Sequence, residues 1–331
     1  MSTSRASRRQ LISGALLYGA GLTASHCVWA QSPRYPARPV RLIVPNAPGS
    51  SVDTISRLLG QQLTPLLAQA LVVDNKAGAA GAVGIDAGKV APPDGYTVIA
   101  ASSSSVTVAP LLQKAISYDP LKDFELISLV ALLPNVLVCR TTLPVNKLSE
   151  FVAYGKAQGG KFNMASAGPG SVSHLAGVAL SAAAGFEALH VPYKGGSQSV
   201  GSVVSGETDW TLTPAPVAMA LVKGGRLKIL GHSMPKGTQP LGPVPSLAET
   251  LPGFEFTSWI GWMGPKGLPP EVLELLRRQL TLVLQTKEIR EGFAVHGAVP
   301  HSSTGEAFRE FLARDIEQTR KAIRLAGVQA E

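Results

Sequence analysis

Short apolar runs alternate with helical patterns from residue 40 to residue 232, and this alternation restricts the fold more than any other feature of the sequence. The first run, residues 40–44, is followed by apolar side chains that recur at three- and four-residue spacing from Ile55 to Leu67. Residues 71–73 and 97–100 continue the series. Strands that alternate with amphipathic helices form parallel sheets covered by helices, so we predict an α/β fold.

A second series of the same kind follows, which predicts two α/β units. Its expected strands are residues 163–165, 189–191, 209–212 and 227–232, and its expected helices include 146–156 and 173–184. Extended apolar segments at residues 124–133 and 254–263 flank this series, as two crossover strands would. We therefore expect one lobe from residues 31–131 and 255–331, and a second lobe from residues 132–254. A long helix over residues 306–326 is expected to begin at a capping box, Ser303-x-x-Glu306, and to end at Gly327.

Residues 1–30 have the pattern of an export signal and are set apart from the fold. Arg5, Arg8 and Arg9 precede a weakly apolar run, and Val28-Trp29-Ala30 fits a small-x-small cleavage site. The stretch of residues 7–12 resembles a twin-arginine signal; an ordinary secretory peptide is the alternative. Cleavage would lower the basic count from 30 to 27 against 22 acidic residues, a net charge of +5, and would leave only Cys139, so no disulfide is expected. We expect a periplasmic protein, and the diffuse charge argues against a nucleic-acid partner.

Three loops share one design: each follows an expected strand, is rich in Gly and Ser, and opens a helix. They are residues 45–51, 166–171 and 194–197. A helix N-terminus presents unpaired N–H groups and partial positive charge, glycine admits a ligand to the backbone, and serine adds a hydroxyl. Several such ends at the carboxyl edge of a sheet could hold a carboxylate without arginine. The alternative is that they are plain helix caps.

Ordered motifs extend this pattern along the chain. They include Val44-Pro45, Pro48-Gly49, Pro93-Asp94-Gly95-Tyr96-Thr97, Gly168-x-Gly170-Ser171-x-x-His174-Leu175 and His190-Val191-Pro192-Tyr193-Lys194-Gly195. In this order, from residue 35 to residue 326, they resemble the substrate-binding proteins of tripartite tricarboxylate transporters, the Bug receptors. The resemblance implies a two-lobed type II periplasmic-binding fold, a Venus flytrap, that closes about two crossover hinge strands. It also implies a monomeric receptor for a di- or tricarboxylate, aromatic acid or amino acid, which serves a membrane transporter or a sensor domain.

The resemblance also implies which residues bind the ligand. They are Asn46, Pro48, Gly49, Ser50 and Ser51 in the first loop, Ser102, Ser103 and Ser105 in the loop after the third strand, and Ser166, Gly168, Gly170, Ser171, Tyr193, Gly195 and Thr213 in the second lobe. The chain departs from the family pattern at Asn46, usually aromatic or apolar, at Ser50, usually glycine, and at Thr213-Pro214, often Asp-Asn. The identity of the acid therefore cannot be carried over.

Several side chains allow two interpretations. Asp53 could bind a ligand amine or satisfy N–H groups of the first helical turn, and His174 and Trp259 are expected to be structural rather than ligand contacts. The alternative function is an exported α/β hydrolase that uses Ser166 or Ser171 with His174, but no acidic residue is positioned to orient that pair. The histidines lack metal-ligand spacing, and no dinucleotide or P-loop motif is present, so neither a metal nor a cofactor is expected.

Overall fold

The computed structural model describes residues 35–329, and the predicted signal peptide lies outside this range. The chain has one mixed sheet with strand order β2-β1-β3-β9-β4-β7-β5-β6, with β8 and β10 both paired to β4. The predicted α/β fold of two lobes is confirmed, whereas the predicted lobe boundaries stay predictions. No helix within residues 35–329 combines the length and apolar character needed to cross a membrane.

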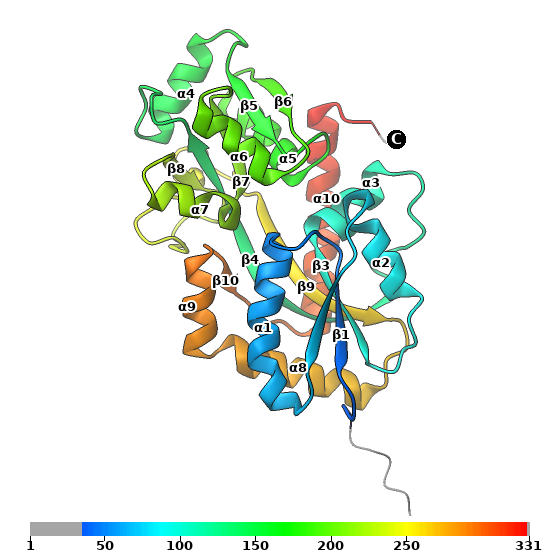
Figure 1. The fold of residues 1–331 in the computed structure, drawn as a ribbon. Coiled ribbons are helices and arrows are strands. Elements are labelled where there is room, and N and C mark those ends of the chain that lie inside the picture. The colour runs from blue at the N-terminus through cyan, green and yellow to red at the C-terminus, as the bar shows by residue number, and fades with distance from the viewer. Residues whose placement is uncertain (1–34, 330–331) are drawn as a thin grey trace, which may run out of the picture. The chain divides into compact units, whose positions relative to one another are not determined.

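The first lobe begins with a parallel three-stranded unit (Figure 1). Its elements are β1 (Val40–Val44), α1 (Ser51–Leu67), β2 (Leu71–Asn75), η1 (Ala79–Gly81), α2 (Ala82–Lys89), β3 (Thr97–Ser102), η2 (Ser103–Val108) and α3 (Ala109–Leu112). β1 lies between β2 and β3 and is almost fully buried, as expected of a central parallel strand.

The second lobe also contains a parallel three-stranded unit, in which β5 pairs with β6 on one side and with β7 on the other. Its elements are α4 (Leu148–Ala157), β5 (Asn163–Ser166), α5 (Val172–Ala184), β6 (Leu189–Pro192), α6 (Gly196–Ser205), β7 (Trp210–Pro214), α7 (Ala215–Lys223), β8 (Lys228–His232) and η3 (Leu247–Glu249). α4 and α5 cover one face around Phe151 and Trp210, and α6 and α7 cover the other face around Val200 and Ala218.

Two antiparallel strands, β4 (Phe124–Cys139) and β9 (Thr257–Pro265), connect the lobes. Both appear in Figure 1 as ribbons that leave the group around β3 and enter the group around β7. β4 is longer than the predicted crossover segment, and beyond residue 135 its side chains alternate between the two cores of the second lobe. Leu137 faces the core of α4 and α5, whereas Val136 and Val138 face the core of α6 and α7.

The register of these strands brings the carboxyl ends of both parallel units together. Ser102, the last residue of β3, lies opposite Ile260, which lies opposite Ala131 of β4. Pro214, the last residue of β7, lies opposite Asn135 of the same strand. β3 runs parallel to β4 and β7 runs antiparallel to it, so their carboxyl ends point toward each other. They end four residues apart along β4, about 13 Å at the usual rise per strand residue.

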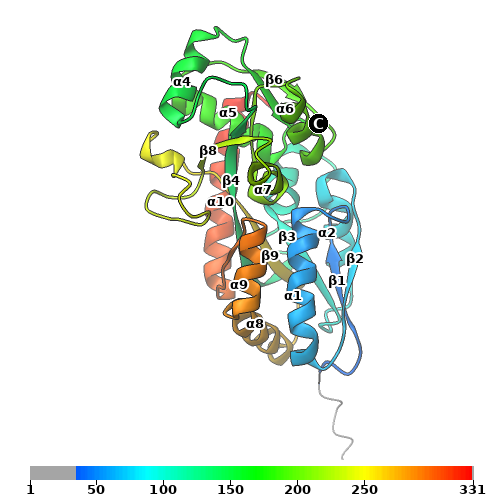
Figure 2. The same ribbon diagram turned by 60° about the vertical axis from the view of Figure 1, so that its left-hand side comes forward.

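The helices after β9 close the first lobe and reach the second. They are α8 (Pro270–Leu284), α9 (Lys287–Val295) and α10 (Gly305–Ala326), with the short strand β10 (Val299–Pro300) against β4. α1, α8 and α9 pack together on one face (Figure 2), while α2 and α10 cover the other. The carboxyl half of α10 packs on α5 through Ala322, Ile323 and Leu175, so one helix contacts both lobes.

The predicted end of α10 is right and its predicted start is wrong. Gly327 is the left-handed C-cap, but the N-cap is Thr304, whose hydroxyl accepts from the Ala307 amide. Ser303 is instead bonded to β4: its amide donates to the Ser128 hydroxyl, and its hydroxyl accepts from the Leu129 amide. Ser303, which the local pattern predicts as the N-cap, therefore forms hydrogen bonds with β4 instead.

Close packing of α10 on β9 gives a test of this arrangement. A Cβ at Gly261 would lie 2.3 Å from the ring of Phe308, and both residues are buried. We expect Gly261→Ala to lower the free energy of unfolding by roughly 1–3 kcal/mol through overpacking, measured by denaturant unfolding. The matched control is Gly201→Ala in the exposed part of α6, where no atom lies within 4 Å of the new carbon. That variant should be neutral or gain up to about 1 kcal/mol; equal losses in both variants would contradict the packing described here.

Candidate functional site

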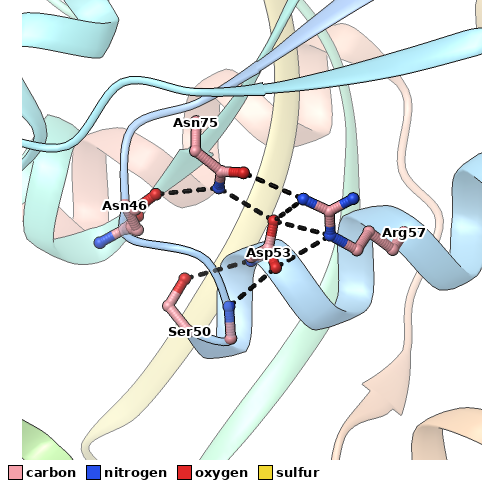
Figure 3. A network of polar contacts seen from close by, with 6 residues as sticks. Asn46, Ser50, Asp53, Arg57 and Asn75 are labelled. Carbon is pink, nitrogen blue, oxygen red and sulfur yellow. Dashed lines mark hydrogen bonds and ion pairs between the residues drawn. The ribbon is translucent and has the colours of Figure 1, made fainter.

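The turn from β1 to α1 is organised around the Asp53 carboxylate (Figure 3). One oxygen accepts from the Gly49 amide at 2.9 Å, and the other accepts from Asn75 Nδ2, also at 2.9 Å. Arg57, one helical turn later, donates Nε to both oxygens at 3.0 Å. Asn75 Nδ2 also donates to the Asn46 carbonyl, so the last residue of β2 is bonded both to the turn, at Asn46, and to α1, at Asp53.

Asp53 is therefore a structural anion. Burial opposes its ionisation, but the hydrogen bonds from Arg57, Gly49 and Asn75 outweigh burial and hold its pKa below the ordinary value. The residue is 3 % exposed and both of its carboxylate oxygens accept hydrogen bonds, which agrees with the expected role in the first turn and not with an amine site. Ser50, as the N-cap of α1, accepts from the Asp53 amide. Among the predicted residues of this loop, Pro48 and Gly49 are exposed, and Asn46, Ser50 and Ser51 are half-buried.

The predicted loop after β3 does not exist as a loop. A turn of π-helix, η2, begins directly after Ser102, because Ser102 and Ser105 form a reciprocal capping box. The Ser103 hydroxyl accepts from the Trp259 amide of β9 at 3.2 Å. All three predicted serines are buried, and the half-buried serine of this run is Ser104, which was not predicted and whose hydroxyl lies 3.0 Å from Ser102 Oγ. The Ser102-x-x-Ser105 spacing is the signal that could have singled out Ser104.

The β5–α5 loop uses its own backbone donors internally. The Ala167 amide donates to Ser173 Oγ at 2.9 Å, and the Gly168 amide donates to Ser166 Oγ at 3.0 Å. The Gly170 amide donates to His174 Nδ1 at 3.0 Å. Gly168 and Gly170, two of the predicted ligand-binding residues, therefore use their amides to hold the loop in shape.

Two histidines stack beneath this loop. The rings of His174 and His190 lie 3.8 Å apart between centroids and 11° from parallel, and His190 Nε2 lies 2.6 Å from Ser166 Oγ. The hydrolase alternative paired Ser166 or Ser171 with His174, whereas the structure pairs Ser166 with His190. Ser166 is fully buried, and no ion pair joins either imidazole to a carboxylate within residues 35–329. His174 itself is buried, as expected of a capping residue.

Three further predicted residues lie along the edge of the second lobe. Tyr193 packs its ring on the core of α6 and α7, and its hydroxyl is buried without a hydrogen-bond partner among the described residues. Burial, with a contribution from Glu207, raises the pKa of Tyr193. Gly195 is the N-cap of α6, and Thr213 is buried one residue before the end of β7.

Close approaches at glycines bring these loops into one region. A Cβ at Gly81 would lie 2.7 Å from Ser105 Cβ and 3.3 Å from the Pro45 carbonyl, so the β1–α1 turn, η1 and η2 meet. A Cβ at Gly170 would lie 2.3 Å from Leu112 of α3, which places the β5–α5 loop against the first lobe. A Cβ at Gly168 would lie 3.1 Å from the Tyr193 carbonyl, so the β6–α6 loop is adjacent as well.

The donors that remain are the first-turn amides of the helices. Ser51 and Val52 of α1, and Val172 and Ser173 of α5, occupy helix positions whose N–H groups have no intrahelical acceptor. Each helix start also carries partial positive charge. Arg57 is bound to Asp53 and Asn75. An anion placed here would meet amides and hydroxyls rather than a free guanidinium.

Two surface hollows outside this region are less suited to an anion. One, of about 360 Å³, lies beside α5 and is lined mainly by apolar side chains with Glu187 and His190. The other, of about 480 Å³, lies between η2 and α10 and carries Asp119 and Glu317 against Arg320. Neither is lined by a predicted ligand-binding residue, and their carboxylates would repel an acid. Trp259 lies in neither, because it is fully buried against Phe308 and bonded to Asp315.

Known proteins resemble this chain over nearly all of the described range. Residues 55–328 match the family described as the tripartite tricarboxylate transporter family receptor. Protein BugT of Bordetella pertussis is 33% identical over 297 residues, which cover 89% of this chain and 91% of that protein. Among solved structures, R. palustris Rpa4515 with adipate has a TM-score of 0.82 at 26% identity and covers 90% of this chain and 100% of its own.

MatC from Rhodopseudomonas palustris with bound malate has a TM-score of 0.76 at 26% identity, over 87% of this chain and 100% of its own. The family match covers well over half of the chain and includes α1 from Ile55 onward, η2, both crossover strands and the β5–α5 loop. The resemblance inferred from the ordered motifs is thereby confirmed. The chain belongs to the tripartite tricarboxylate transporter receptor family.

Proposed function

We propose that this protein is a periplasmic receptor that captures a small carboxylate where the carboxyl ends of β1 and β3 face those of β5 and β7. One observation carries the proposal: the N-termini of α1 and α5 belong to loops that pack against consecutive elements of the first lobe, η1 and η2 in one case and α3 in the other, and the guanidinium of Arg57 on α1 is already paired with Asp53. Backbone amides and hydroxyls bind a carboxylate with defined geometry, and the helix ends supply the compensating charge. The relatives with adipate and malate support a carboxylic acid as the ligand.

The proposed ligand contacts differ in kind from one part of the site to the next. The first-turn amides of α1 and α5 and the hydroxyls of Ser51, Ser104 and Ser171 would contact the acid directly. Ser102, Ser103, Ser105 and Ser166 would instead keep the turns in shape, because these four residues are buried and bonded within the protein, whereas Ser51, Ser104 and Ser171 are only half-buried. Asn46 and Thr213 depart from the family pattern, and we propose that they contribute to the choice of acid.

Non-enzymatic capture is supported by the environment of the serines. A hydrolytic serine needs an accessible hydroxyl, a base and a group that orients the base. Ser166 is buried beside His190, and Ser171 is the N-cap of α5, where its oxygen accepts from the His174 amide. We therefore propose a monomeric carrier without cofactor or metal that delivers its acid to a membrane transporter or a sensor, after export by the signal in residues 1–30.

Recovery of an unchanged acid tests capture against catalysis. The protein should co-purify with a carboxylic acid at close to one molecule per chain, identified by mass spectrometry after denaturation. A panel of dicarboxylates, tricarboxylates, aromatic acids and amino acids should contain acids that raise the melting temperature, since a ligand of the native state stabilises it by about 2.7 kcal/mol at 100 times its Kd. Turnover of the bound acid would contradict the proposal, as would the absence of any stabilising acid.

A charge placed at Ser171 tests the position of the site. Aspartate is also a good N-cap, so Ser171→Asp should keep α5 intact while it puts a carboxylate where one should bind. A like charge at about 4 Å costs roughly 4 kcal/mol at an effective dielectric of 20, which corresponds to an affinity loss on the order of 1,000-fold. The readout is calorimetric affinity for the acid found in the panel. Ser171→Asn is the neutral control with the same capping ability, and equal affinities for the two variants would place the ligand elsewhere.

A further inference from the structure

The shape of the β5–α5 loop depends on an unprotonated ring nitrogen. His174 Nδ1 accepts the hydrogen bond from the Gly170 amide, and an imidazole that carries a proton on Nδ1 has no lone pair for this bond. The backbone of Gly170 has φ +70°, and Leu112 occupies the space beside it, so the loop has little room to find another arrangement. The amide that would lose its acceptor is buried.

A second imidazole makes protonation of His174 more costly. The ring of His190 stacks on it almost in parallel, with 3.8 Å between centroids, so a charge on either ring disfavours a charge on the other. His190 Nε2 is in turn bonded to Ser166, whose hydroxyl accepts from the Gly168 amide. The two histidines thus hold the loop at Gly168 and at Gly170.

No ion pair within residues 35–329 joins a carboxylate to either imidazole, and the one carboxylate that lines the hollow beside His190 is exposed. Helix α10 packs on α5 through apolar side chains. The basic residues of α10 in this part are exposed (Lys321 and Arg324) or paired with Glu317 (Arg320). Asp315 of α10 is bonded to Thr107 and Trp259, on the other side of η2. β5, β7 and η2 contribute no titratable side chain to this region, and Glu187 lies exposed in the hollow beside His190.

We propose that the stacked pair of His174 and His190 is a proton-sensitive clamp that positions the β5–α5 loop, and that protonation of the pair releases the loop. His174 acts as a positioning residue through the Gly170 amide and does not contact the ligand. The consequence for binding rests on the proposed function: a receptor in acidic surroundings would hold its carboxylate less tightly, because the loop that carries the start of α5 would lose its fixed shape.

The sign of the pH dependence follows from the clamp. Burial, together with the charge of His190, lowers the pKa of His174 to about 4, and burial also lowers the pKa of His190. An imidazole in an open loop would titrate near the ordinary value of about 6.5. Opening therefore takes up a proton between these two values, so the closed loop is fully favoured above pH 6.5 and loses stability as the pH falls toward 4.

The test uses ligand-free, 15N-labelled protein, so its outcome is independent of whether the proposed carboxylate is found. Nuclear magnetic resonance should show His174 Nδ1 unprotonated at neutral pH. The Gly170 amide signal should shift together with the His174 ring, with a midpoint between about pH 4 and pH 6.5. The Gly201 amide on α6, remote from the pair, serves as the internal reference. The thermal melt at each pH verifies that the protein remains folded.

Two conservative variants separate a clamp from a merely structural histidine. In His174→Asn, Oδ1 can accept from the Gly170 amide without titrating, so the Gly170 signal should be flat over this pH range. In His190→Gln, the glutamine Nε2 can take the place of the imidazole Nε2 beside Ser166 but cannot become charged. The pH midpoint of the His174 titration should therefore rise. Titration of Gly170 with an unchanged midpoint in His174→Asn would overturn the proposal. A proton on His174 Nδ1 at neutral pH in the wild-type protein would also overturn the proposal. This measurement does not depend on whether the variant folds.

Discussion

The antiparallel pairing of β4 with β9 is the constraint on which the rest of the structure depends. β3 pairs with β9 and β7 pairs with β4, so the register of this pair sets where the two parallel units stop relative to each other. Because the strands of the two units run in opposite directions along β4, their carboxyl ends meet across it. Every helix that follows one of these ends then starts in the same region, which is where open α/β sheets bind ligands.

Within that region, side chains of the protein accept hydrogen bonds from several backbone amides. Asp53 binds the Gly49 amide, Ser103 binds the Trp259 amide, and His174 binds the Gly170 amide. Each bond fixes a turn and leaves the following helix start to supply donors. A site of this kind is preorganised, and preorganisation reduces the ordering that binding must otherwise bring about. α10, which packs on both lobes, adds a further connection between the turns and the crossover strands.

The sequence predicted the large-scale features well, because they rest on periodicity and on ordered motifs. The alternation of strands and helices, the two crossover segments, and the loops over residues 45–51 and 166–171 that open helices are all visible in local patterns. The use of individual donors was not predictable in the same way. Ser303 looks like a cap but bonds to Ser128, since a strand 175 residues away competes for it. Ser102 and Ser105 form a capping box and Ser103 accepts a hydrogen bond from β9, and the serine-rich run alone does not reveal the contact with β9.

The central claim is that the starts of α1 and α5 together hold one carboxylate. The most direct measurement is a crystal structure of the protein with the acid that co-purifies with it. We expect a carboxylate group within hydrogen-bond distance of the first-turn amides of both helices, with no arginine or lysine nitrogen in direct contact. A bound acid in the hollow beside α5, in the hollow between η2 and α10, or held by a basic side chain would contradict the account.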